Sequence, residues 1–345
     1  MGTTSTFNYF YNLMKLNDFL KQIDEIDVEP TPKEVVFTTD NVKLYHYKSN
    51  KRKKCPVPLL IVYALVNRYY MMDLQEDRSF IKRLIEQGID VYLIDWGYPE
   101  RADRYLTLED YIDGYINDCV NFIREKHKLE KINLLGVCQG GTFSVIYSAL
   151  YPEKIRNLVT MVTPVDFDTD DGLLNVWSRY MDVDEMVDAF GNISGDFMNF
   201  GYLMLKPFQL NFEKYYNFIK GANELETVKN FVRMEKWIFD SPDQAGEAFR
   251  KFIKDLYQQN KLVKGEFELG GRKVNLKNIT MPILTIYAEQ DHLVPPASTK
   301  PLNDLVGSKD KQLLAFPGGH IGIYVSSRSQ KELAPTVAKW LQERS

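Results

Sequence analysis

The chain has 345 residues, of which 44% are hydrophobic and 26% charged, so it is long enough to bury a sizeable core in one or two domains. Its formal net charge of −4 excludes the strong basic field typical of nucleic-acid-binding proteins. The longest apolar run, residues 57–66, is interrupted by Pro58 and is too short to span a bilayer.

The first twenty residues contain neither a basic region nor a continuous apolar region, so we expect no signal peptide. The three cysteines have unrelated spacings and predict neither a disulfide framework nor a zinc site. We therefore expect a cytoplasmic protein with reduced thiols, no bound metal and no transmembrane segment.

Strand-like and helix-like segments alternate along the first 164 residues. Apolar strand composition occurs at residues 58–64, 89–96, 131–137 and 157–163, and helical spacing at residues 76–88, 107–127 and 142–152. Thr107 is the expected N-cap of the second helix. The same alternation returns near the end, with strands at 281–288 and 312–316 and a closing helix at 329–343. This alternation predicts an α/β fold with a mostly parallel, doubly wound sheet.

Residues 165–270 interrupt that rhythm. They are rich in Met, Phe, Tyr, Asn and Trp and contain helical pieces such as 228–239, but no apolar strand. A structureless loop of this length would be improbable in a compact domain. We therefore expect a core formed by residues 1–164 and 271–345, with a large, mainly helical cap at 165–270 over the active site.

Residues 136–140 read GVCQG, directly after the strand at 131–137. This is the frame of a nucleophile elbow, G-x-S-x-G, with cysteine in place of serine. A thiolate at Cys138 would be the nucleophile. The fold that uses this elbow needs an acid and then a histidine later in the chain.

Two of the four histidines lie outside that order. His46 is in an early strand-like segment and His127 ends a long helix, and we expect structural roles for both. His320 and Asp291 follow predicted strands and complete the order Cys138, Asp291, His320. In this arrangement His320 is the general base and Asp291 orients its imidazole.

The tetrahedral intermediate needs fixed hydrogen-bond donors. The backbone N–H of Gln139 should supply one, and the N–H of Val66, in the loop after the first apolar strand, the other. His292 either packs against Asp291 to support the site or contacts the substrate. Asn67 is a second candidate supporting residue.

An acyl group on cysteine has about the same transfer potential as an acyl group in a thioester donor. Attack of a thiolate on a thioester exchanges one thioester for another, so the acyl group stays activated for transfer to an alcohol. A large cap that excludes water would favour such an acceptor over hydrolysis. Cysteine and cap together indicate acyl transfer from a coenzyme A thioester.

Seven strings of the sequence resemble the catalytic subunit of class III polyhydroxyalkanoate synthases, which have the α/β-hydrolase fold. They are VPLLIVYALVNR (57–68), VYLIDWGYP (91–99), NLLGVCQGG (133–141), NLVTMVTPVDF (157–167), MEKWIFDSPDQAGE (234–247), QDHLVPP (290–296) and FPGGHIGIYVS (316–326). The resemblance implies polymerisation of (R)-3-hydroxyacyl-CoA, mainly 3-hydroxybutyryl-CoA, into intracellular polyester. CoA would be released as the leaving group, and no other cofactor is implied.

The resemblance also implies roles for individual residues. Cys138 resembles the acylated nucleophile and His320 the general base, while Asp291 either orients His320 or activates the incoming 3-hydroxyl. It implies further a non-catalytic companion subunit, a homodimer and association with polymer granules. Two alternatives remain open: a cysteine-nucleophile thioesterase of the dienelactone hydrolase type, and a granule scaffold without activity.

Overall fold

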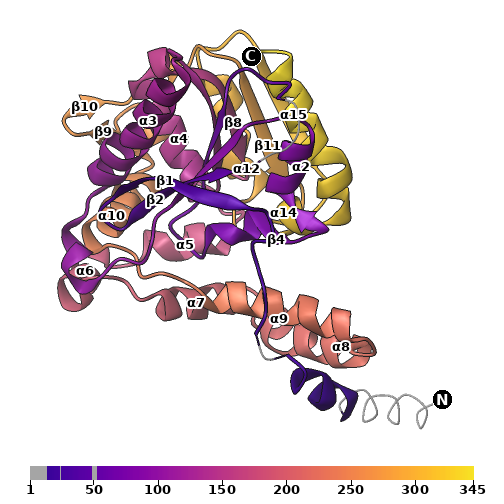
Figure 1. The fold of residues 1–345 in the computed structure, drawn as a ribbon. Helices are drawn as coiled ribbons and strands as arrows, with labels where there is room; N and C mark the ends of the chain where they lie inside the picture. The colour runs from indigo at the N-terminus through magenta and orange to yellow at the C-terminus, as the bar shows by residue number, and fades with distance from the viewer. Residues whose placement is uncertain (1–13, 24, 49–52) are drawn as a thin grey trace.

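The computed structural model describes residues 14–23, 25–48 and 53–345. Part of the segment considered for a signal peptide lies outside these ranges. The molecule is built around an eight-stranded sheet of order β1-β2-β6-β3-β7-β8-β11-β12 (Figure 1). Its strands are β1 (Lys33–Thr39), β2 (Val42–Tyr47), β3 (Leu59–Val62), β6 (Val91–Asp95), β7 (Ile132–Val137), β8 (Ile155–Met161), β11 (Ile283–Ala288) and β12 (Lys311–Phe316).

The six segments predicted as strands form the parallel part of this sheet. Strands β6, β3, β7, β8, β11 and β12 pair in parallel, whereas β2 is antiparallel to both β1 and β6. Every residue of β3, β6 and β7 is buried, which is the pattern of strands covered on both faces. The predicted α/β architecture is therefore confirmed.

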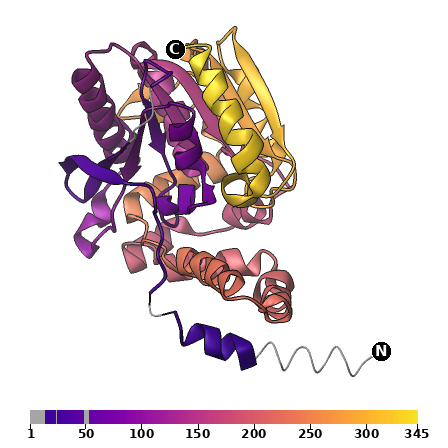
Figure 2. The same cartoon turned by 45° about the vertical axis from the view of Figure 1, so that its right-hand side comes forward.

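Helices cover both faces of the sheet (Figures 1 and 2). One face packs against η3 (Asp110–Ile116), α3 (Asn117–His127) and α4 (Gln139–Leu150). The other packs against α2 (Phe80–Glu86), α14 (Gly322–Val325), η8 (Ser329–Leu333) and α15 (Ala334–Gln342). Shorter elements are η1 (Tyr69–Met72), η2 (Arg101–Tyr105), η4 (Pro152–Lys154), η7 (Leu276–Asn278), α12 (Pro296–Thr299), α13 (Leu302–Leu305), β9 (Glu268–Leu269) and β10 (Arg272–Lys273).

Two helix starts test the sequence predictions. The helix predicted at 76–88 begins later, because β4 (Asp73–Gln75) and β5 (Arg78–Ser79) form a hairpin there. Ser79 accepts a hydrogen bond from the Lys82 N–H at 2.9 Å and so caps α2. Thr107 caps the helix formed by η3 and α3, as predicted, since its hydroxyl accepts a hydrogen bond from the Asp110 N–H at 3.3 Å.

Residues 165–270 are mainly helical. Their helices are α5 (Leu173–Arg179), α6 (Val183–Phe190), α7 (Gly195–Met204), η5 (Gln209–Glu213), α8 (Lys214–Gly221), α9 (Leu225–Phe239), α10 (Gly246–Lys251), η6 (Phe252–Gln258) and α11 (Lys261–Lys264). Figures 1 and 2 show α7, α8 and α9 as a layer set apart from the sheet. The helices α10 and η6 contribute to one hydrophobic cluster of the sheet, and Trp237 near the end of α9 contributes to the other. The boundaries of the cap at 165 and 270 stay a prediction.

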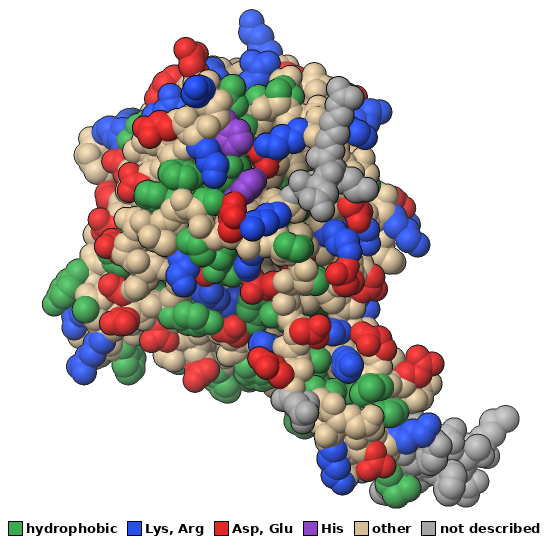
Figure 3. Space-filling view, viewed as in Figure 1, with side chains coloured by type: hydrophobic (Ala, Val, Ile, Leu, Met, Phe, Trp, Pro, Cys, Tyr) green, Lys and Arg blue, Asp and Glu red, His purple; other side chains and the backbone are tan. Residues whose placement is uncertain are grey.

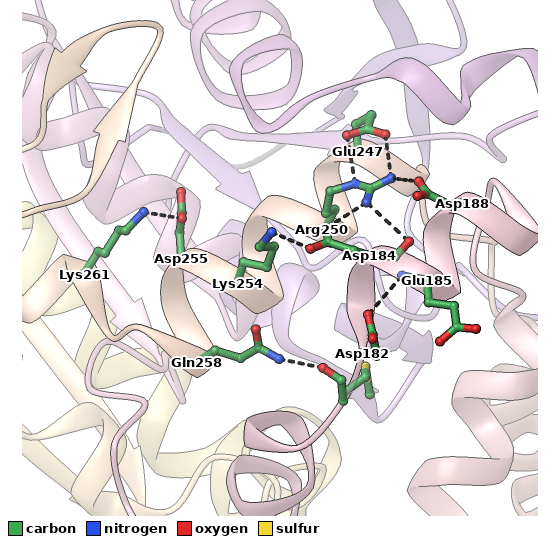
Figure 4. A network of polar contacts seen from close by, with 11 residues as sticks. Asp182, Asp184, Glu185, Asp188, Glu247, Arg250, Lys254, Asp255, Gln258 and Lys261 are labelled. Carbon is green, nitrogen blue, oxygen red and sulfur yellow. Dashed lines mark hydrogen bonds and ion pairs between the residues drawn. The ribbon is translucent and has the colours of Figure 1, made fainter.

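An ion-pair network fixes α6 on α10 and η6 (Figure 4). The Arg250 guanidinium lies 2.8 Å from Asp184 and 2.6 Å from Asp188, and Lys254 lies 2.6 Å from Asp184. Hydrogen bonds from Lys254 and Arg250 hold the pKa of Asp184 below its usual value. The first part of the cap is thus anchored by charge to the helix that returns to the core.

Large apolar side chains are exposed over the cap. They include Trp177, Tyr180, Phe190, Phe197, Phe200, Phe208, Phe212 and Phe239. Figure 3 shows hydrophobic side chains along the lower rim of the main body and on the lower lobe. Within the described ranges, none of the helices has the length and apolarity that a bilayer crossing requires.

Candidate active site

The nucleophile turn joins β7 directly to α4 at Cys138. This half-buried residue has φ +54° and ψ −125°, an unusual conformation for a residue with a side chain. A Cβ at Gly140 would lie 2.4 Å from the Tyr63 carbonyl oxygen, and one at Gly141 would lie 1.9 Å from Thr163 Oγ1. The two glycines therefore let the start of α4 approach the neighbouring strand ends and expose the thiol.

The acid lies just past β11. The Oδ1 atom of Asp291 accepts hydrogen bonds from the N–H groups of Leu293 and Val294, both at 2.9 Å. Its Oδ2 atom lies 2.7 Å from Nδ1 of His320. The turn thus holds one carboxylate oxygen and leaves the other to the imidazole.

His320 lies between Asp291 and Cys138. Burial lowers its pKa, but the charges of Asp291 and Cys138 and hydrogen bonds with both outweigh burial and raise the pKa to about 10. Neither Gly318 nor Gly319 has a positive φ, so these glycines do not supply unusual backbone freedom. A Cβ at Gly318 would lie 2.8 Å from the Phe316 ring, so this glycine provides room.

Four tyrosines lie within electrostatic reach of Cys138, and the sequence did not identify them. They are Tyr63 after β3, Tyr202 on α7, Tyr257 on η6 and Tyr324 on α14. Burial raises the pKa of each, and the negative charge of Cys138 adds to the effect in all four. Through Tyr202, α7 lies within electrostatic reach of the nucleophile. The aromatic richness of the cap was the available signal, but it does not specify positions.

The two backbone N–H groups predicted as oxyanion donors, those of Gln139 and Val66, have no hydrogen-bond acceptor among the described residues. Gln139 is the first residue of α4, where backbone N–H groups have no intrahelical partner. The Leu65 N–H donates to Gln139 Oε1 at 3.1 Å. Neither the Gln139 N–H nor the Val66 N–H donates a hydrogen bond to any of the described residues. Both groups therefore remain candidate donors.

The two candidate supporting residues differ in their surroundings. The Asn67 side chain donates to the carbonyls of Trp237 and Ile238, at 3.3 and 3.1 Å, so it binds the cap. Burial, followed by the charge of Lys206, lowers the pKa of His292. Within the described ranges no hydrogen bond joins His292 to another residue, and both interpretations of His292 stay open.

The other two histidines lie in a separate polar cluster around Asp90. His46 Nε2 lies 2.8 Å from Asp90 Oδ1, and His127 Nε2 lies 2.9 Å from the Tyr92 hydroxyl. These contacts agree with the structural roles expected for both. Among the residues described, no three His, Cys, Asp or Glu side chains are grouped so that they could hold a metal ion.

Comparison with known proteins places the chain in a family. Residues 57–327 match the alpha/beta hydrolase fold, and residues 22–84 match the poly-beta-hydroxybutyrate polymerase (PhaC) N-terminus. The poly(3-hydroxyalkanoate) polymerase subunit PhaC of Allochromatium vinosum is 56% identical over 344 residues, covering 99% of this chain and 97% of the relative. The chain belongs to the PhaC family.

Further comparisons agree with this assignment. PhaC of Synechocystis sp. is 54% identical, with 96% of this chain and 89% of that relative covered. The crystal structure of Paleococcus ferrophilus monoacylglycerol lipase has a TM-score of 0.57 at 17% identity and covers 88% of this chain and 99% of that chain. That likeness concerns the fold alone. The predicted α/β-hydrolase fold and the resemblance to PhaC subunits are both confirmed.

Proposed function

We propose that this PhaC protein is an acyltransferase that polymerises (R)-3-hydroxyacyl groups, mainly 3-hydroxybutyryl, from their CoA thioesters into polyester. The observation that carries this function is the 56% identity to a named polymerase subunit over nearly the full length of both chains. The grouping of His320 with Asp291 and Cys138 supports the chemistry.

In the first half of the cycle, Cys138 attacks the thioester carbonyl as a thiolate paired with protonated His320. The raised pKa of His320 supports a proton on the imidazole at neutral pH. The tetrahedral oxyanion accepts hydrogen bonds from the N–H groups of Gln139 and Val66. When the intermediate collapses, the CoA thiolate leaves and takes the proton from His320, and the acyl group stays on Cys138.

In the second half, neutral His320 accepts the proton of a 3-hydroxyl on a bound monomer or growing chain. The resulting oxygen nucleophile attacks the acyl-Cys138 carbonyl, an ester bond forms, and the thiolate is restored beside an imidazolium. Both oxygens of Asp291 already have partners in His320, Leu293 and Val294. This occupancy supports Asp291 as the residue that orients His320, rather than as the group that activates the hydroxyl.

The cap supports transfer to an alcohol. Tyr202 comes from α7 and lies within electrostatic reach of Cys138, which supports a cap helix close to the nucleophile. Water excluded from such a site competes less with the 3-hydroxyl. The thioester on Cys138 keeps the acyl group activated until the alcohol arrives.

We also propose that the protein forms a homodimer, binds a companion subunit and associates with polymer granules. A companion subunit, a homodimer and the granule surface would each require apolar surface, and the exposed cap side chains such as Phe197 and Phe200 supply it. The protein would act in the cytoplasm at that granule surface. CoA enters as part of the substrate, with no separate cofactor.

The function is tested by incubating the protein with (R)-3-hydroxybutyryl-CoA, with and without a companion subunit, while thiol release and product size are measured. Polyester with CoA release is expected, and Cys138→Ala should abolish both. Cys119→Ala is the matched control, because Cys119 is fully buried in α3, away from the site. CoA release with only free 3-hydroxybutyrate would identify a thioesterase instead.

A further inference from the structure

Both backbone polar groups of Leu65 are hydrogen-bonded, the N–H in the peptide unit before this residue and the C=O in the peptide unit that it shares with Val66. The Leu65 carbonyl accepts a hydrogen bond from Gln244 Nε2 at 2.9 Å. The Leu65 N–H donates to Gln139 Oε1, from the elbow, at 3.1 Å. Gln244 belongs to the segment between α9 and α10, so a residue of the predicted cap binds the loop that carries a predicted oxyanion donor.

Peptide geometry gives this bond a consequence for Val66. A trans peptide is planar, and its C=O and N–H groups point in opposite directions. The described part of the chain contains no cis peptide bond. A donor that fixes the Leu65 carbonyl therefore also fixes the direction of the Val66 N–H. An oxyanion donor must have that direction set before the reaction begins.

Gln244 is itself rigidly placed. Its side chain is only 2% exposed, and its backbone pairs with Ile193 through hydrogen bonds of 2.8 and 2.9 Å. The loop is bound to the same cap segment at two further points. Asn67 donates to the carbonyls of Trp237 and Ile238, and Trp237 Nε1 donates to the Arg68 carbonyl at 2.8 Å.

We propose that Gln244 is a positioning residue that orients the Val66 N–H as an oxyanion donor. The cap segment 237–244, and not the sheet alone, thereby sets the geometry of the oxyanion hole. This inference rests on the proposed function, because it assigns a role within the same acyl transfer.

Gln244→Met tests the role, since it removes the donor and keeps a side chain of similar length. Two reactions of Cys138 are compared: rapid-quench acylation by (R)-3-hydroxybutyryl-CoA, and alkylation by iodoacetamide. Alkylation forms no oxyanion, so it reports the thiolate and its accessibility but not the hole. Acylation should fall by about 10- to 100-fold, while alkylation changes by less than about 2-fold.

Tyr98→Phe is the matched control. It removes the 2.6 Å hydrogen bond from the Tyr98 hydroxyl to Asp240, which ties the core to the same cap segment without touching the loop peptide. Both rates should stay unchanged in this variant. An equal fall of both rates in Gln244→Met, or no fall in acylation, would overturn the inference.

Gln244→Glu provides a second test if Gln244→Met does not fold. Its carboxylate repels the Leu65 carbonyl when ionised and donates to it when protonated. The ratio of acylation to alkylation, relative to wild type, should therefore recover as pH falls, and a pH-independent ratio would overturn the inference. Wild type that alkylates but never acylates would instead refute the proposed function.

Discussion

The Nδ1 atom of His320 lies 2.7 Å from Oδ2 of Asp291, although 29 positions separate them in sequence. The other oxygen of Asp291 accepts the N–H groups of Leu293 and Val294. Because the carboxylate is held by its own turn, it presents a fixed acceptor to one ring nitrogen. The other ring nitrogen is then left for Cys138.

Asp291→Asn should separate orientation from packing. Asparagine keeps the size of the side chain and can accept from Leu293 and Val294, but it presents an amide NH₂ to Nδ1 of His320. The imidazole must then take the wrong tautomer for proton transfer with Cys138. We expect acylation to slow by about 10³- to 10⁴-fold in rapid-quench measurements, with little change in melting temperature. A loss smaller than about 10-fold would argue against the orienting role.

The stability of the protein should depend on pH through His320. Its folded pKa is raised from 6.5 to about 10, mainly because Asp291 and Cys138 overcome the effect of burial. A raised pKa stabilises the folded state fully below the unfolded value and loses that contribution as pH rises through the folded value. Urea unfolding at about pH 6, 8 and 9.5 should show the advantage of wild type over His320→Gln shrinking with pH. A constant difference would contradict this assignment.

Gly140→Ala should damage the elbow, whereas the same change in a cap helix should not. A Cβ at Gly140 would lie 2.4 Å from two backbone carbonyl oxygens, those of Val62 and Tyr63, which cannot move independently. We expect a loss of about 3 kcal/mol or more in unfolding free energy. At Gly201 on α7, a Cβ would meet nothing within 4 Å, so Gly201→Ala should stabilise by about 0.5 kcal/mol. Equal effects in thermal melts would refute the steric argument.

Asp90→Asn should destabilise the fold without affecting the nucleophile. Burial raises the pKa of Asp90, but hydrogen bonds from His46 and Lys53 have the opposite and larger effect, so the pKa falls to about 2. The ionised carboxylate therefore stabilises the fold above its unfolded pKa of 3.8, and this contribution is lost as pH falls through about 2. We expect a loss of about 3 kcal/mol near neutral pH in urea titrations. Cys138 alkylation should keep its wild-type rate, and a parallel loss would show that the clusters are coupled.

Much of the core could be predicted from local patterns. Buried parallel strands are continuous apolar runs, so β3, β6 and β7 were visible in the sequence. The chain order of Cys138, Asp291 and His320 predicted that the three residues lie close together, because the fold brings the carboxyl ends of parallel strands together. The late start of α2 was missed, because β4 and β5 pair as a hairpin just before it and Ser79 caps the helix there.

The contacts between cap and core could not be predicted in the same way. Gln244 and Tyr202 belong to segments without a catalytic motif, and their neighbours lie far away in sequence. Gln244 meets Leu65 across 179 positions, a separation that periodicity and spacing do not encode. Asn67, predicted only as a supporting residue, has a φ of 57° and donates to the carbonyls of Trp237 and Ile238.

The central claim is that acyl transfer passes through Cys138. It is tested most directly by mixing the protein with (R)-3-hydroxybutyryl-CoA, quenching within one turnover and mapping the acylated peptides by mass spectrometry. The account predicts a 3-hydroxybutyryl group on the peptide that contains Cys138 and none on Cys55 or Cys119, which are buried. Polymer formation with an unmodified Cys138, or acylation that persists in Cys138→Ala, would contradict it.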